Sequence, residues 1–126
     1  MRLAASFLFG LLAELATGLV IGGGMYFTTG RAMPPNPANL PSWVPVVAIL
    51  AGSVFTFVIA YWRASRNTDR AMAHALLVAA GAIGLHLLTT MGDGQSLTII
   101  PIIADVMKLG AGAMAGEVVR RRSHTH

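Results

Sequence analysis

The chain contains no cysteine. This absence excludes disulfide bonds, thiol chemistry, iron–sulfur clusters and cysteine-ligated zinc. Charged residues are also scarce: they make up 11% of the 126 residues, whereas a soluble domain usually carries about 25%. Hydrophobic residues make up 55%, and the mean hydropathy is +0.66. A soluble domain of this size could not bury so much apolar surface, so the composition favours a protein of the lipid bilayer.

The basic character of the chain does not indicate a nucleic-acid partner. The formal net charge is +4 and the pI is about 10.8, values that can mark nucleic-acid binding in a soluble domain. Here the basic residues flank apolar segments, which is the pattern that membrane topology produces. The sequence also shows no nucleophile–base arrangement and no cluster of metal ligands. We therefore predict a non-enzymatic protein with no cofactor and no nucleic-acid partner.

Four apolar runs reach the length of about 20 residues that a helix needs to cross the hydrocarbon core. They predict one all-α domain over residues 1–126, a bundle of four transmembrane helices. The first run, beside Arg2, also resembles a signal peptide. It is longer than the apolar region of about 7–15 residues in such peptides, and it contains Glu14, so a retained helix is favoured. The four predicted spans are Leu3–Phe27, Val44–Trp62, Ala71–Met91 and Leu97–Val119.

The connections between these runs contain residues that end or begin helices. Residues 33–37 read Met-Pro-Pro-Asn-Pro, which cannot form regular helix because proline lacks the amide donor. Ser42 is predicted to cap the second helix, with Pro45 in its first turn. Residues 67–69 predict a turn and a cap before the third helix, and residues 92–96 predict a tight turn that ends in a cap for the fourth.

The arginines predict the orientation. Positive residues concentrate in cytoplasmic loops. With four crossings, seven arginines lie on one side and Arg31 alone lies on the other. Both termini are therefore predicted to be cytoplasmic, in the plasma membrane (the inner membrane of a bacterial cell). The seven are Arg2, Arg63, Arg66, Arg70, Arg120, Arg121 and Arg122.

Small residues four positions apart recur in every predicted span. Helices in lipid associate where small residues let their backbones approach. These pairs either pack the four helices against one another, or one of the faces mediates association with a second copy or another membrane subunit. The pairs are Gly18 and Gly22, Ala48 and Gly52, Ala80 and Gly84, and Gly112 and Gly116.

Ionisable residues inside the spans carry most of the functional information, because a charge at the bilayer centre is unfavourable by about 2.5–3.5 kcal/mol on insertion scales. Glu14 and Lys108 lie near the midpoints of the first and fourth spans, and Asp105 lies one turn from Lys108. At a rise of about 1.5 Å per residue, His86 lies roughly 9 Å to the outer side of the midplane, and His74 lies a similar distance to the inner side.

Two functions remain open from these residues. In the first, the chain is a small oligomeric transporter or channel for a proton, a cation or a small solute, and it uses Glu14, Asp105, Lys108 and His86. In the second, it is a non-catalytic membrane subunit or assembly partner. Lys108 then pairs with Asp105 or Glu14 to lock the helices together, and the remaining acid is protonated by desolvation.

Two short segments resemble known families. Residues 84–88, Gly-Leu-His-Leu-Leu, resemble the haem-ligand helix of succinate dehydrogenase membrane anchors, which would imply haem b. His74 and His86 are about 18 Å apart along one helix and cannot ligate the same iron, so bis-histidine haem needs a second chain. Residues 12–14, Leu-Ala-Glu, are similar to the first helix of small multidrug-resistance transporters. The chain lacks that family's aromatic constellation and adds Lys108, so neither family is assigned.

Overall fold

The computed structural model describes residues 2–30, 42–92 and 99–124. The described residues form four long helices and one short 3-10 turn, with no strand among them. The all-helical prediction is confirmed. The elements are α1 (Arg2–Thr29), α2 (Trp43–Ser65), η2 (Thr68–Arg70), α3 (Ala71–Gly92) and α4 (Ile99–His124).

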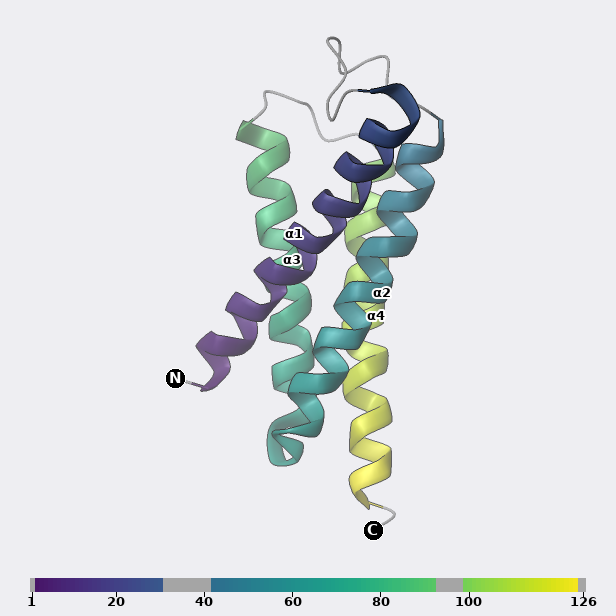
Figure 1. Ribbon diagram of the computed structural model, residues 1–126. Coiled ribbons are helices and arrows are strands. Elements are labelled where there is room, and N and C mark those ends of the chain that lie inside the picture. Colours follow the sequence, from purple (N-terminus) through teal and green to yellow (C-terminus); the bar gives the residue numbers. More distant parts are fainter. Residues whose placement is uncertain (1, 31–41, 93–98, 125–126) are drawn as a thin grey trace.

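The four helices run alternately up and down, so the two termini lie at the same end of the bundle (Figure 1). The helix pairs α1–α2, α1–α3, α2–α3, α2–α4 and α3–α4 are in contact. Over the described residues α1 and α4 make no backbone contact with each other. The bundle is therefore a rhombus in cross-section, with α2 and α3 on the short diagonal and α1 and α4 at the far corners.

Small and polar side chains occupy the interior, and large aliphatic side chains face outward. The hydrophobic core is built mainly from alanines, and the largest fully buried side chains are Val78, Thr56 and Ser6. Exposed residues include Leu12, Leu19 and Leu50 among many others on all four helices. A soluble protein buries its large apolar residues, whereas helices in lipid place small residues at their contacts. This arrangement is compatible with a membrane location.

Three of the helices, α1, α2 and α3, are long and apolar enough to span a membrane. Over its described residues α4 is not among them. This helix carries Asp105, Lys108 and Glu117 within its length. Its crossing of the membrane therefore remains a prediction.

Glycine contacts set the closest helix approach, which lies between α1 and α3. A Cβ on Gly10 would overlap the carbonyl oxygen of Val78, and a Cβ on Gly81 would overlap that of Phe7. The two backbones cross here, and α1 passes obliquely over α3 (Figure 1). On α4, Gly112 and Gly116 also pack against α3, where added Cβ atoms would lie 2.7 Å from Ala79 Cβ and 2.9 Å from Met72 Sδ; this confirms that predicted packing pair.

Other predicted glycine contacts are not made within the chain. Cβ atoms added at Gly18 or Gly22 would meet no atom of the described residues within 4 Å. The pair of small residues on α1 is therefore directed away from the bundle. Ala80 is exposed, and a Cβ on Gly84 would meet only the end of the Phe7 ring, at 3.9 Å. The α3 backbone contact uses Gly81 instead.

The helix ends differ in part from the predictions. Pro45 falls in the first turn of α2 as predicted, but Ser42 makes no side-chain capping hydrogen bond, because its backbone is already helical (φ −62°, ψ −23°). Asn67 does not cap with its side chain either. Its Nδ2 donates to the Arg63 carbonyl at 2.9 Å and so closes the end of α2. Gly30 ends α1 with a φ of 75°, which glycine adopts without strain.

The predicted proline-rich connection over residues 33–37 and the predicted cap at Ser96 lie outside the described residues. The same holds for Arg31.

Candidate functional site

The four ionisable residues predicted to form a site lie together in one network across three helices. Lys108 Nζ is 2.5 Å from Glu14 Oε2 and 3.8 Å from Asp105 Oδ1. Asp105 Oδ1 is in turn 2.7 Å from His86 Nδ1. Glu14 comes from α1, His86 from α3, and Asp105 and Lys108 from α4. We call these four residues the charged network.

Lys108 connects α4 to α1, two helices whose backbones do not meet over the described residues. Its side chain is 3% exposed and crosses the bundle interior between α4 and α1. It passes over α2 at Gly52, where a Cβ would come within 2.8 Å of Lys108 Cε and within 3.8 Å of Thr17 Oγ1. The absence of a side chain at Gly52 gives the lysine stem its path. Thr17 donates to the Ala13 carbonyl at 2.9 Å, so it adds a polar atom beside the stem.

The His86–Asp105 pair forms the other half of the network. The side chain of Asp105 is 12% exposed and that of His86 is 21% exposed. Asp105 has two neighbours of different kinds, the lysine ammonium and the imidazole. The ring is the most accessible member of the network, and His86 lies six residues before the end of α3 at Gly92.

A groove of about 440 Å³ opens beside Glu14 between α1 and α3. It is lined by aliphatic side chains together with Gly18 and Thr89. The groove lies beyond the α1–α3 crossing, where the two helices diverge (Figure 1). Glu14, with its side chain 15% exposed, therefore borders both the interior lysine and the outward groove. The lining residues are Glu14, Leu15, Gly18, Leu19, Leu85 and Thr89.

A second polar cluster, which sequence reasoning missed, lies nearer the termini. Arg63 Nε donates to Ser6 Oγ at 3.0 Å, and Ser6 Oγ is 2.6 Å from His74 Nδ1. Ser6 and His74 are buried. Because arginine has only donors, the serine oxygen accepts from it and its hydroxyl hydrogen is left for the imidazole. The Arg63 guanidinium also lies 5.2 Å from the centre of the Phe9 ring.

The two histidines of α3 therefore have different partners. His86 contacts a carboxylate and His74 contacts a serine beside an arginine. The structure does not bring the two rings together on a common centre. Among the described residues there is no group of three or more histidine and carboxylate side chains that could hold a metal ion.

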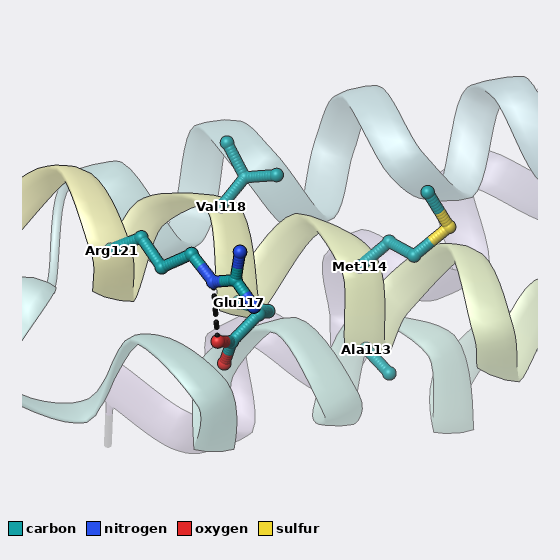
Figure 2. A pocket seen from close by; sticks show the side chains of 5 residues that line it. All are labelled: Ala113, Met114, Glu117, Val118 and Arg121. Atoms are coloured by element: carbon teal, nitrogen blue, oxygen red, sulfur yellow. Dashed lines mark hydrogen bonds and ion pairs between the residues drawn. The ribbon is translucent and has the colours of Figure 1, made fainter.

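Glu117 lies near the C-terminal end of α4, beside the arginines. Arg120 makes two hydrogen bonds to it, at 2.8 and 2.6 Å, and these raise the pKa of the arginine above its usual value. Arg121 adds a third at 2.9 Å. Figure 2 shows Glu117 and Arg121, which line a surface hollow of about 390 Å³ together with other residues of α4. Among the described residues no other helix contributes a polar group to this hollow, so the charged network is the stronger candidate site.

Comparison with known protein families finds no matching family, and comparisons with curated proteins and with solved structures find no match. Function must therefore be inferred from the residues themselves.

Proposed function

We propose that the chain is a small membrane transporter or channel in which the charged network controls the movement of a proton, a cation or a small solute. The observation that carries this proposal is the contact of two carboxylates, one lysine and one histidine inside the bundle, with Lys108 and Asp105 buried and Glu14 and His86 partly buried. Ionisable groups inside a membrane are rare, and they mark ion and substrate pathways more often than buried charges in soluble proteins mark sites.

The position of the network supports this function over a purely structural role. A simple lock needs one acid for one base, whereas here Lys108 has two acids within 4 Å. The second acid, Asp105, contacts the partly exposed His86. Ion binding and release require a site that can change its charge and that is accessible from the surface.

The proposal includes four membrane crossings with both termini in the cytoplasm. The support is the common end of the two termini (Figure 1) and the arginines at the ends of α2 and α4. Reporter fusions at residue 126 and near Asn67 should report cytoplasm, and one near Asn36 should report the outside. A reporter at residue 126 that reads outside would contradict the topology.

Liposome flux tests the transport function directly. The purified chain is reconstituted, and fluxes of protons and of monovalent cations are followed with ion-sensitive dyes. Glu14→Gln and Asp105→Asn should each lose most of the flux while the chain remains folded. Glu117→Gln is the matched control, because this carboxylate lies outside the network. Equal flux from all three variants and the unchanged chain would refute charge-dependent transport.

The alternative is a non-catalytic subunit or assembly partner, with haem b anchoring as a special case that needs a second chain. One observation favours it: the Lys108–Glu14 contact joins two helices that are otherwise separate, as a structural lock would. Purification from the native membrane separates the two functions. A homo-oligomer supports transport, whereas co-purification with other membrane subunits in fixed ratio supports the alternative, and a visible absorption spectrum of the same sample tests for haem.

A further inference from the structure

The charge count of the network leaves one negative charge unbalanced. Glu14 and Asp105 are two acids, and Lys108 supplies one positive charge. The network lies among apolar helices, where a net charge is strongly unfavourable. One additional proton makes the whole network neutral. The question is which residues hold it.

The distances place that proton away from Glu14. Lys108 Nζ lies 2.5 Å from Glu14 but 3.8 Å from Asp105, so the lysine balances mainly the glutamate. Asp105 is left with His86 Nδ1 at 2.7 Å. Asp105 of α4 contacts the ring itself. The other ionisable groups of the network are Lys108 of α4, 3.8 Å from Asp105, and Glu14 of α1, which borders the groove that Leu85 and Thr89 of α3 also line. Arg63 of α2 binds in the other cluster.

We propose that the His86–Asp105 pair carries one exchangeable proton and that the ion handled by the network is therefore a proton. This inference rests on the proposed transport function. In the proton-bound state, which we call the loaded state, both ring nitrogens of His86 are protonated and Asp105 is ionised. On release the ring keeps its Nδ1 hydrogen toward Asp105 and the proton leaves from Nε2. No bond between heavy atoms changes, and the network goes from neutral to one negative charge.

The loaded and empty states of the network differ in net charge, and therefore in their stability inside the bundle. The empty state has an excess negative charge, which favours uptake of a proton from the side to which the partly exposed ring opens. Glu14 and Lys108 remain paired in both states, so helices α1 and α4 stay connected while the proton binds and leaves. Proton binding thus uses His86 and Asp105, whereas Glu14 and Lys108 connect the helices.

Nitrogen NMR of the full chain in lipid bilayers at pH 7 tests the proton directly. Histidine ring signals are assigned with His86→Gln and with His74→Gln, the latter removing the matched buried histidine. His86 should carry two ring protons, and Asp105→Asn should convert it to a neutral ring. Infrared detection of a protonated Asp105 beside a neutral ring would also support the proposal, because the pair would still hold the proton. A neutral ring beside an ionised Asp105 would overturn it, as would a ring that carries two protons and keeps both in Asp105→Asn.

Proton flux separates this inference from the proposed function. With an imposed potassium diffusion potential and a pH-sensitive dye, His86→Gln should lose most of the proton flux and His74→Gln should retain it. Flux of another ion that is unchanged by His86→Gln would overturn the proton assignment and leave transport standing. A loaded His86 in a chain that passes no ion would refute transport and leave the proton site standing.

Discussion

Lys108 reaches Glu14 across the long diagonal of the bundle, with its Nζ 2.5 Å from Oε2. The two helices that carry these residues make no backbone contact over the described residues. The link therefore depends on the length of the lysine side chain and on the open path over Gly52. A shorter base at this position, or a larger residue at position 52, would separate the charges.

The first prediction concerns the pairing itself. Lys108→Met should destabilise the fold by about 3–5 kcal/mol, because removing one partner leaves buried acid unpaired, whereas replacing the whole set can be nearly neutral. Thermal unfolding in detergent should therefore show a large loss for Lys108→Met. Much of that loss should be recovered in the triple variant Glu14→Gln, Asp105→Asn, Lys108→Met. A well-folded triple variant with full biological activity would leave only the structural role.

The second prediction uses Gly52 to disturb the lysine without changing any charge. Gly52→Ala places a Cβ 2.8 Å from Lys108 Cε, so the lysine stem must move while its ammonium is held by Glu14. We expect a stability loss of roughly 1–3 kcal/mol, as for other overpacked sites, and reduced flux. Gly110→Ala is the control, because its Cβ meets no atom within 4 Å. Equal effects of the two changes would contradict the proposed lysine path.

The third prediction concerns the crossing of α1 and α3. Gly81→Ala would drive a Cβ into the Phe7 carbonyl oxygen, and backbone cannot yield as a flexible side chain does. Its unfolding temperature should fall more than that of Gly52→Ala, with a free-energy loss of about 3 kcal/mol or more. Gly18→Ala, on the open face of α1, should be close to neutral. A stable Gly81→Ala variant would show that the helices do not cross at this position.

The fourth prediction concerns self-association. A leucine at Gly18 would meet no atom of the described residues within 4 Å at its Cβ, so Gly18→Leu should leave the folded monomer intact. If the α1 face contacts a second copy, the added bulk should weaken the oligomer by separating the backbones. Gly110→Leu is the matched change on α4. Cross-linking in lipid and light scattering in mild detergent measure the outcome, and an unchanged oligomer would exclude this face.

The helices could be predicted from the sequence because apolar length determines a span and does not require knowledge of packing. Which glycines meet could not be predicted. The α3 sequence is so rich in alanine and glycine that several faces have small residues four apart, and Gly81 lies only one residue after Ala80. A shift of one residue turns a helix face by about 100°. The contact was therefore assigned to the wrong face of the correct helix.

The depth of the network residues along their helices could be predicted from the sequence, but the pairing of their side chains could not. Rise per residue placed Glu14 and Lys108 at one level. It could not show that Asp105 turns toward His86, since that depends on how α3 and α4 are rotated. The cluster of Ser6, Arg63 and His74 was missed because Arg63 had been read only as a topology signal. The three residues have similar depths near the predicted cytoplasmic ends of their helices, and this similarity could have been used to predict the cluster.

The close backbone contact at Gly10 and Gly81 is the point about which α1 would pivot if it moved against α3. Glu14 lies four residues from it, about 6 Å along the axis, whereas Phe27 lies seventeen residues away, about 26 Å. A swing of α1 about this point would carry its far end about four times as far as Glu14. The short arm would hold the carboxylate near Lys108, while the long arm would widen or narrow the groove between α1 and α3. A helix that pivots in this way would change the contacts of its far end and keep the contact of Glu14 with Lys108.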